Sequence, residues 1–421
     1  MKTAVLGYGI EGKSAERYLK KHALAGDSVE VFDEFDMNTL DLSGFDTVVR
    51  SPSVSPLLIK GNGLEVTSST KIFFNKCPAP IIGVTGTKGK GTTCSLIASI
   101  LRAAGRTVHL VGNIGVPALD ELDKVAADDI VVYELSSFQL WDLDKSPHIA
   151  VVVHIEPDHL NVHSDYDEYI DAKANIVKYQ SVNDFVVYDS TNSESVKIAE
   201  KSAAKKLPYP SKEYASFDDF NLLFSEQVIC SISDLKVPGE YNKMNALAAI
   251  SAAWQYTKNP ADYQKGLSSF TGLPHRINLV REVDGVKYYD NSISTVPGSA
   301  VADIESFKEP KVMIIGGSDK GADMSALVQA IKGGGVRQTI LIGQSADGLE
   351  KQLESVGVEN FINLGVDTSM NEIVRWAADS AEPGDVVILS PAHASFDMFK
   401  SYSDRGDQFV TAVQALSTKN A

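Results

Sequence analysis

The sequence predicts an α/β protein of three domains: a Rossmann-like N-terminal domain, a central P-loop domain with a mainly parallel sheet, and a C-terminal Rossmann-like α/β domain. Three observations predict this fold class. The chain has 421 residues, enough for about three domains of ordinary size. Short apolar runs alternate with amphipathic helical stretches, which is typical of parallel sheets covered by helices. Two glycine-rich segments, at residues 7–12 and 83–91, each join an apolar run to a helical pattern.

The N-terminal domain is expected at residues 1–75. Strands are expected at residues 4–6, 29–32 and 48–49, with a tight turn at 7–12 and an amphipathic helix at 14–24. Asp33 follows the second strand about 20 positions after the glycines, as in Rossmann units that bind a nucleotide or its diphosphate. The glycine pattern alone is weak, so a plain turn without a ligand is the alternative interpretation.

The central domain is expected at residues 76–272, after a proline-containing linker at 76–80. Strands are expected at residues 81–84, 130–133, 150–154 and 185–188, and long helices at 166–179 and 242–254. This alternation predicts a doubly wound, mainly parallel sheet that binds ligands at the carboxyl ends of its strands. Residues 208–226 are polar and aromatic without a clear period, which indicates a surface excursion.

The C-terminal domain is expected at residues 273–421, with strands at 287–289, 311–315, 339–342 and 386–389. No internal repeat or low-complexity tract stands out in the chain.

Composition limits the classes of partner. The net charge of −16 argues against nonspecific binding to nucleic acid or to an anionic membrane, although a local basic cleft remains compatible with an anionic substrate. The three cysteines are widely spaced and suggest neither a disulfide framework nor a zinc site. The N-terminus lacks the apolar core of a signal peptide, and no apolar stretch approaches the length of a membrane span. We therefore expect a cytoplasmic protein.

The most informative segment is 83–93, Gly-Val-Thr-Gly-Thr-Lys-Gly-Lys-Gly-Thr-Thr. A glycine-rich turn between a strand and a helix lets backbone N–H groups surround phosphates, and Lys90 can reach the terminal phosphates. The usual motif has Ser or Thr directly after Gly-Lys, whereas here Gly91 intervenes. The segment predicts a nucleoside triphosphate site, with a ligand-free glycine turn as the alternative.

Two further strand ends carry candidate metal ligands. Glu134 ends an apolar strand, and Asp158 and His159 follow the next strand along the chain. A carboxylate at such a position is where triphosphate enzymes hold Mg²⁺, which prefers oxygen ligands. Each residue alone is equally well explained as a polar loop residue, but together they favour a metal site.

Motifs in all three domains occur in an order that resembles the Mur ligase family. In the first two domains these are residues 85–90, 112–115 (Gly-Asn-Ile-Gly), 134–140 (Glu-Leu-Ser-Ser-Phe-Gln-Leu), 158–160 (Asp-His-Leu) and 169–173 (Tyr-Ile-Asp-Ala-Lys). The C-terminal domain adds residues 272–276, 316–321, 389–397, Arg405-Gly406 and Phe409. Segments 134–140 and 389–397 are specific for the glutamate-adding branch, whereas the P-loop alone indicates only the wider group of ATP-dependent ligases.

The resemblance implies an ATP-dependent amide ligase that activates a carboxylate as an acyl phosphate and uses Mg²⁺. ATP-binding residues would be Gly86, Thr87, Lys88, Gly89, Lys90, Gly91, Thr92, Thr93, Asn242, Asn245 and Arg276. Catalytic and metal-binding residues would be Lys90, Thr92, Glu134, His159 and Lys173. Lys173 would act as an N-carbamate, because a cation cannot ligate a metal; its alternative interpretation is a solvated helix lysine.

The resemblance also implies the remaining substrates, UDP-N-acetylmuramoyl-L-alanine and glutamate, and a monomeric enzyme that binds no nucleic acid. The uridine diphosphate would contact Gly9, Ser14, Asp33 and Ser51, the muramoyl part would contact Asn113, and Ser136 would be a further substrate-binding residue. The incoming glutamate would contact Thr295, Lys320, Ser395 and Tyr402. Lys320 is the expected partner of its side-chain carboxylate.

Several residues depart from the family pattern. Because of Gly91, the hydroxyl for Mg²⁺ is expected from Thr92 or Thr93, or is absent. Ile293 replaces a lysine near the glutamate site, His393 stands where a cysteine is usual, Tyr241 where a histidine is frequent, and Ser53 where a glycine is usual. The alternatives left open are a folylpolyglutamate-type or L-glutamate-using ligase, a nucleotide-dependent oxidoreductase suggested only by residues 7–12, and a noncatalytic homologue.

Overall fold

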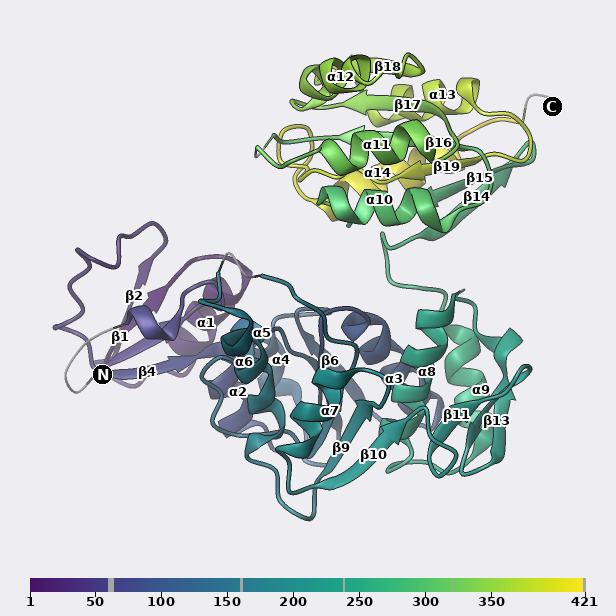
Figure 1. Cartoon of the computed structure of the whole chain (residues 1–421). Helices are drawn as coiled ribbons and strands as arrows, with labels where there is room; N and C mark the ends of the chain where they lie inside the picture. Colours follow the sequence, from purple (N-terminus) through teal and green to yellow (C-terminus); the bar gives the residue numbers. More distant parts are fainter. Residues whose placement is uncertain (60–63, 160–161, 238, 320, 419–421) are drawn as a thin grey trace. The chain divides into compact units, whose positions relative to one another are not determined.

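The computed structural model describes residues 1–59, 64–159, 162–237, 239–319 and 321–418. The chain forms two compact units, Met1–Thr271 and Gly272–Ala421 (Figure 1). Both units consist mainly of parallel strands alternating with helices, so the predicted α/β class is confirmed.

The first unit begins with a four-stranded parallel sheet in the order β2-β1-β3-β4. Its strands are β1 (Lys2–Leu6), β2 (Ser28–Phe32), β3 (Thr47–Arg50) and β4 (Glu65–Ser68). The helix expected at 14–24 is α1 (Ile10–Lys21), which begins directly after Gly9, so the second half of the expected turn is helical. Strand β4 and the helix that follows it, α2 (Ser69–Lys76), were not among the predicted elements.

The same unit contains a six-stranded sheet in the order β10-β9-β8-β5-β7-β6, in which every pair is parallel. Its strands are β5 (Ile81–Thr85), β6 (Val108–Gly112), β7 (Ile130–Glu134), β8 (Ile149–Val152), β9 (Phe185–Asp189) and β10 (Lys205–Tyr209). Strand β5 lies between β7 and β8, so three neighbouring strands end beside the glycine-rich loop. The expected strands match β5, β7, β8 and β9 within about two residues, whereas β6 and β10 were not predicted.

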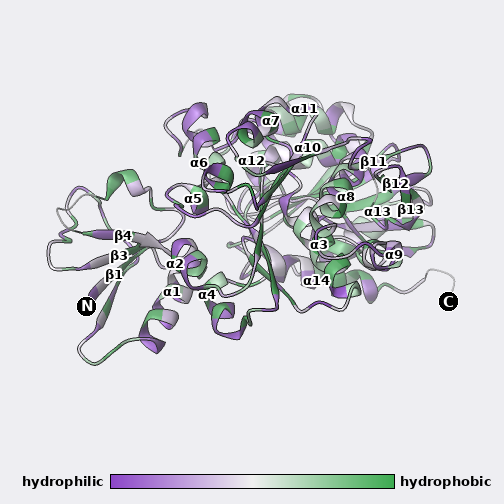
Figure 2. Ribbon diagram, turned by 90° about the horizontal axis from the view of Figure 1, so that it is seen from below, coloured by the Kyte–Doolittle hydropathy of each residue, from purple (hydrophilic) through white to green (hydrophobic). Residues whose placement is uncertain are grey.

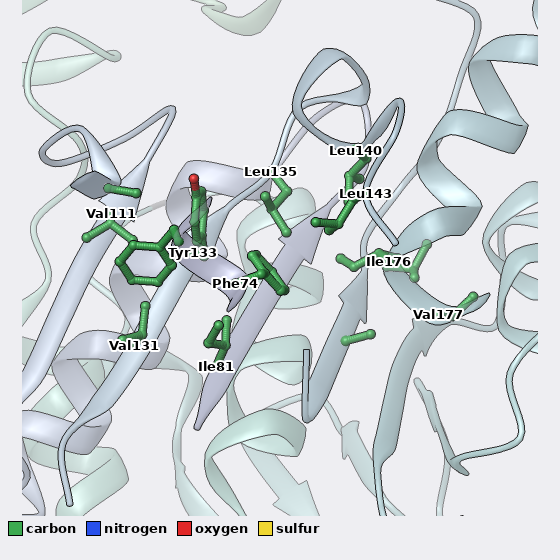
Figure 3. Close-up of a cluster of buried hydrophobic side chains, with 14 of the residues drawn as sticks. Phe74, Ile81, Val111, Val131, Tyr133, Leu135, Leu140, Leu143, Ile176 and Val177 are labelled. Atoms are coloured by element: carbon green, nitrogen blue, oxygen red, sulfur yellow. The ribbon is translucent and has the colours of Figure 1, made fainter. Parts of the chain in front are cut away.

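Helices cover both faces of this sheet. One face packs on α3 (Lys90–Ala103) and α8 (Glu240–Ala253), and α9 (Pro260–Ser269) packs in turn on α3. The other face packs on α2, α4 (Ala118–Glu121), α5 (Ser137–Leu140), α6 (Tyr166–Lys178) and α7 (Ser193–Glu200). Figure 3 shows the second contact, where the fully buried ring of Tyr133 lies beside Phe74, with ring centroids 5.7 Å apart. This core fixes the ends of β5 and β7.

Residues 208–226 were expected to be a surface excursion, and the structure adds that this segment contains regular strands. It contains β11 (Ala215–Phe217) and β12 (Asn221–Phe224), and these two strands form a three-stranded antiparallel sheet with β13 (Gln227–Ser231). The ring of Phe224 stacks on Trp254 at 4.0 Å, which anchors the sheet beside α8. The sheet has only three strands, of which β11 and β13 are edge strands, so their conformation depends on pairing more than on a pattern in the sequence.

The second unit contains a mixed sheet in the order β14-β15-β19-β16-β17-β18, in which only β14 and β15 pair antiparallel. Its strands are β14 (Asn278–Val283), β15 (Val286–Asp290), β16 (Lys311–Gly316), β17 (Val336–Ile342), β18 (Phe361–Gly365) and β19 (Val386–Leu389). Strands β14 and β18 were not predicted.

Helices again cover both faces of the mixed sheet. One face packs on α10 (Pro297–Ser306), α11 (Ser325–Gly333) and α12 (Ala346–Ser355), and the other on α13 (Met370–Ser380) and α14 (Tyr402–Gln414). Figure 2 shows hydrophilic and hydrophobic residues mixed along the helices, as expected for helices with one buried face. Among the described residues, no helix combines the length and the apolar character needed to cross a bilayer.

Candidate active site

The loop after β5 has the geometry of a phosphate-binding turn. It runs from Gly86 to Gly89 and leads directly into α3, whose N-cap Gly89 has a φ of 89°. A Cβ at Gly89 would lie 2.3 Å from Oδ1 of Asn245, so both the backbone angle and the close approach require glycine. Lys90 donates from Nζ to the carbonyl oxygens of Gly86 at 3.0 Å and Thr87 at 2.9 Å, and its side chain therefore curls over the loop.

Thr87 fixes this loop to the next strand end and to α6. Its backbone N–H donates to the carbonyl of His154 at 2.8 Å, and its hydroxyl contacts the carbonyl of Glu156 at 2.9 Å. The same hydroxyl lies 2.7 Å from the Tyr169 hydroxyl on α6. Lys88 at the loop tip is exposed and pairs with Glu156 at 2.7 Å.

The three residues after Lys90 lie in the first turn of α3 and are buried. The Thr93 hydroxyl donates to Oδ1 of Asn245 at 3.3 Å, and Asn245 in turn donates to Oδ1 of Asn242 at 3.2 Å. Within the described part of the chain the Thr92 hydroxyl makes no hydrogen bond. The structure thus brings Asn242 and Asn245 of α8 to the loop, and it leaves Thr92 as the hydroxyl that is not already engaged.

Glu134 ends β7 beside the loop and is only 6% exposed. The side-chain amide of Asn113, which follows the neighbouring strand β6, donates to Oε1 of Glu134 at 3.2 Å. Asn113 itself is exposed. Two residues predicted to serve different ligands are therefore hydrogen-bonded to each other at adjacent strand ends.

Lys173 is buried, at 2% exposure, so its interpretation as a solvated helix lysine is wrong. Helix α6 starts at its N-cap Asp165, whose side chain accepts from the N–H of Glu168, and turns the Lys173 face toward the sheet. The Nζ atom donates to the carbonyl of Gly86 at 2.8 Å and lies 4.6 Å from the Tyr169 ring centroid. Burial, and then the charge of Lys90, lowers the pKa of Lys173 well below its usual value.

His159 lies in the loop after β8, with its side chain 48% exposed and a φ of 56°. Its Nε2 is 3.5 Å from Oδ2 of Asp158, and its ring centroid is 5.0 Å from that of Phe138. Over the described ranges, no three His, Cys, Asp or Glu side chains converge as a metal-binding group.

The predicted uridine diphosphate contacts cluster around the first glycine turn. Gly9 is the exposed N-cap of α1, and Asp33 is exposed and accepts from the N–H of Tyr8 at 3.3 Å. Ser51 donates to the carbonyl of Gly7 at 2.6 Å. Ser14, in contrast, is completely buried within α1, and its hydroxyl has no hydrogen-bond partner among the described residues.

The predicted muramoyl contact Ser136 is the N-cap of α5. Its hydroxyl accepts from the N–H of Gln139, whose side chain accepts from the N–H of Ser136. Gln139 also donates from Nε2 to Oε1 of Glu11 on α1 at 3.1 Å. The segment after Glu134 therefore contacts the first turn of α1, beside the glycine turn of the first sheet.

Sequence reasoning missed Arg50, which is completely buried at the end of β3. Its guanidinium donates to both carboxylate oxygens of Asp142 and to the carbonyl of Phe138 at 3.0 Å. It joins the first sheet to the segment after Glu134. A charged residue that ends an apolar strand directly before Ser51 was the signal available in the sequence.

In the second unit, the loop after β15 is held by buried polar groups. His275 contacts Asp290 at 2.7 Å, and this hydrogen bond raises the pKa of His275. Arg405, completely buried, donates to the hydroxyl and carbonyl of Ser292 and to the carbonyl of His393. Burial lowers the pKa of Arg405 to about 10. These bonds fix residues 290–293 against α14 and the segment after β19.

The predicted glutamate contacts have different environments in this unit. Thr295 lies in the same loop and is half-buried, Ser395 is buried, and Tyr402 begins α14 with 40% exposure. Ile293 donates its backbone N–H to the carbonyl of His275. Lys320 falls outside the described residues. Arg276, predicted to contact ATP, is exposed and belongs to this second unit.

Comparisons with known proteins place these motifs in one family. The Mur ligase middle domain matches residues 84–253, and the Mur ligase glutamate ligase domain matches residues 275–393. The UDP-N-acetylmuramoylalanine--D-glutamate ligase of Acetivibrio thermocellus is 38% identical over 99% of this chain and 96% of its own length. The enzyme of the same name from Clostridium novyi is 35% identical over 96% of this chain and 90% of its own length.

Solved structures share the fold at lower identity. The UDP-N-acetylmuramate-alanine ligase MurC of Thermotoga maritima aligns with a TM-score of 0.64 at 17% identity, covering 99% of both chains. FolC of E. coli in complex with DHPP and ADP aligns with a TM-score of 0.59 at 19% identity, over 82% of this chain and 92% of its own. The α/β fold has three domains: a parallel N-terminal sheet, a six-stranded parallel central sheet and a mixed C-terminal sheet. The chain therefore belongs to the Mur ligase family, and its full-length relatives include D-glutamate ligases of that family.

Proposed function

We infer that this chain is an ATP-dependent ligase that joins D-glutamate to UDP-N-acetylmuramoyl-L-alanine and releases ADP and phosphate, a step of peptidoglycan precursor synthesis. The observation that carries this inference is the similarity over nearly the whole chain, at 33–38% identity, to relatives that bear this enzyme's name. The glycine-rich loop with Lys90, beside the buried Glu134, provides the nucleotide end of such a site.

The reaction needs an activated carboxylate, because a free carboxylate is a poor electrophile. ATP transfers its γ-phosphoryl group to the L-alanine carboxylate, and the resulting acyl phosphate is attacked by the glutamate amine. A tetrahedral intermediate then collapses with loss of phosphate, so one C–N bond forms and one C–O bond breaks. We assign Lys90 and the loop N–H groups to the ATP phosphates, where their positive charge offsets the charge of the migrating group.

The residues around the loop suit Mg²⁺. A buried carboxylate, Glu134, and the unengaged hydroxyl of Thr92 offer oxygen ligands on either side of the loop, and His159 would complete the set. When bound, Mg²⁺ neutralises phosphate charge and aligns the phosphoryl group. The protein's part is to hold these ligands on β7, α3 and the loop after β8.

We propose that Lys173 acts as an N-carbamate. A buried lysine with a lowered pKa is more readily the neutral amine that CO₂ requires for carbamate formation. The carbamate would replace a cation beside Lys90 with an anion, removing a like-charge contact and supplying oxygen ligands. This is consistent with the burial of Lys173 against the loop rather than in solvent.

The other substrates are assigned by domain. We propose that residues 1–75 bind the uridine diphosphate through Gly9, Asp33 and Ser51, that residues 76–272 perform the phosphoryl transfer, and that residues 273–421 bind glutamate. Asn113 and Ser136 would contact the muramoyl part. Glutamate would be bound by Thr295, Lys320, Ser395 and Tyr402. Because Ile293 stands where the family has a lysine, Lys320 would be the cation that pairs with the glutamate side-chain carboxylate. We further propose that the enzyme is a monomer and that it is located in the cytoplasm, where its nucleotide substrates are made.

A single assay tests the function. Phosphate release from ATP is measured with UDP-N-acetylmuramoyl-L-alanine in the presence of D-glutamate, L-glutamate or no amino acid. Turnover that depends on D-glutamate is expected. A rate that is equal without an amino acid, or that appears only with L-glutamate, would contradict the proposal. A parallel reaction with a folate acceptor is expected to give no turnover.

A further inference from the structure

His163 lies in an aromatic box close to the proposed phosphoryl-transfer site. Its side chain is completely buried. The imidazole stacks on Phe138 with a centroid distance of 5.2 Å and an interplanar angle of 7°, and it lies 4.7 Å from the Trp141 ring and 5.4 Å from the Tyr169 ring. Contact with three aromatic side chains leaves this ring no freedom to reorient.

The surroundings of the two imidazole nitrogens favour the neutral form of His163. Nε2 lies 3.0 Å from the Ser137 hydroxyl, whereas Nδ1 is buried and has no hydrogen-bond partner among the described residues. The nearest carboxylate oxygen, on Glu168, is 3.9 Å from Nδ1 and already accepts from Trp141 Nε1 at 2.6 Å. Burial lowers the pKa of His163, in agreement with the neutral form that this environment favours.

The partners of His163 belong to the segments that carry the proposed metal ligands. Ser137 and Phe138 lie in the segment directly after Glu134. The ring of Phe138 also contacts His159, at 5.0 Å. Tyr169 lies one helical turn before Lys173 on α6, contacts its Nζ, and is hydrogen-bonded to Thr87 of the P-loop. One imidazole therefore contacts the segments of Glu134 and Lys173 and, through Phe138, the side chain of His159.

We propose that His163 is a positioning residue for phosphoryl transfer: it fixes Phe138 and Tyr169 and, through them, the mutual placement of Glu134, His159 and Lys173. The proposal rests on the proposed function. Residues that orient metal ligands without touching the metal affect both metal affinity and activity. The contacts that carry the proposal all lie in the first unit, so the effect should be confined to the nucleotide and metal requirements of the enzyme.

The test compares His163→Ala with His163→Phe. His163→Ala removes the ring and is expected to raise the Mg²⁺ concentration for half-maximal rate, and to lower kcat, by about 10- to 100-fold. KM for D-glutamate should stay within about twofold, because the loss is not in amino-acid binding. His163→Phe restores the aromatic packing without the Ser137 contact and should recover part of the loss. Ser137→Ala should shift the Mg²⁺ requirement in the same direction by a smaller factor.

The matched control is His148→Phe, at a histidine just before β8 that is paired with Asp184 at 2.9 Å. It should leave the Mg²⁺ requirement unchanged. Thermal unfolding of every variant identifies simple loss of fold. A Mg²⁺ requirement in His163→Ala equal to that of the wild type would overturn the proposal. An equal loss of affinity for every substrate, without recovery in His163→Phe, would also overturn it. If the wild type shows no turnover with D-glutamate, Mg²⁺-dependent binding of ADP to the same variants is measured by calorimetry. This measurement tests the proposal for His163 independently of the proposed function.

Discussion

Lys173 on α6 donates a hydrogen bond to the carbonyl oxygen of Gly86 in the P-loop over 2.8 Å, although the two residues are 87 positions apart. Lys90 donates to the same carbonyl from the start of α3. Two lysine side chains thus converge on one oxygen in a buried setting, and the charge of Lys90 contributes to the lowered pKa of Lys173. A negative modification of Lys173 would relieve this repulsion.

The first prediction concerns that modification. Lys173→Ala should lower turnover by about 100-fold or more, because an oriented ligand of the phosphoryl-transfer site is lost. Short carboxylates such as formate or acetate should restore part of the rate, and CO₂-depleted buffer should slow the wild type. Lys178→Ala, an exposed lysine on the same helix, is the control. Wild-type rates in Lys173→Ala, measured by phosphate release, would remove the carbamate proposal.

The second prediction distinguishes the two threonines of α3. Thr92→Val should raise the Mg²⁺ concentration for half-maximal rate by about 10-fold, whereas Thr92→Ser should retain the hydroxyl and remain near wild type. Thr93→Val should instead weaken nucleotide binding, because its hydroxyl is bonded to Asn245. Mg²⁺ titrations of the initial rate separate these effects. An unchanged Mg²⁺ requirement in Thr92→Val would show that this hydroxyl is not a ligand.

The third prediction concerns the buried contact between Arg50 and Asp142. Arg50→Met leaves a carboxylate unpaired in a largely buried position and should cost about 3 to 5 kcal/mol. The double variant Arg50→Met/Asp142→Leu should recover much of this loss, since no unpaired charge remains. Lys71→Ala removes an ion pair to the exposed Asp144 and should cost less than about 1 kcal/mol. Unfolding measurements that rank all three variants equally would contradict this assignment.

The fourth prediction is a pH dependence in the second unit. The hydrogen bond to Asp290 raises the pKa of His275, so the imidazolium is the stabilising form. Its contribution is complete below the ordinary value of 6.5 and is lost as the pH rises through the raised pKa. The wild type should exceed Asp290→Asn in Tm by about 3 °C at pH 6, for a contribution of about 1 kcal/mol. Calorimetric scans between pH 6 and 9 should show this difference shrinking, and a constant difference would contradict it.

The local signals were sufficient for most of the fold. Apolar runs predicted β5, β7, β8 and β9 to within about two residues, and the glycine-rich loop lies where the sequence places it, between β5 and α3. Strands β6 and β10 were missed, as were the short strands of residues 215–231. The missed strands lie at sheet edges or in a small three-stranded sheet, where pairing with other segments decides their conformation more than a local pattern does.

The candidate site was predicted less completely than the fold. Glu134 and the P-loop follow from strand ends and glycines, which are local features of the sequence. Arg50 and His163 were missed because each acquires its environment from segments far away in the chain. Ser14 was predicted at the nucleotide turn, but the direction of its side chain depends on the packing of α1.

The sequence by itself determined the α/β class, the order of the motifs and the residue types available for phosphate and metal binding, because these depend on periodicity and on neighbours along the chain. Only the tertiary structure decided that Lys173 is buried, that Thr93 is engaged by Asn245 while Thr92 is not, and that His163 is enclosed by three aromatic rings. Burial and hydrogen-bond partners are set by residues brought together from distant positions, and these long-range contacts determine which of the available groups can act.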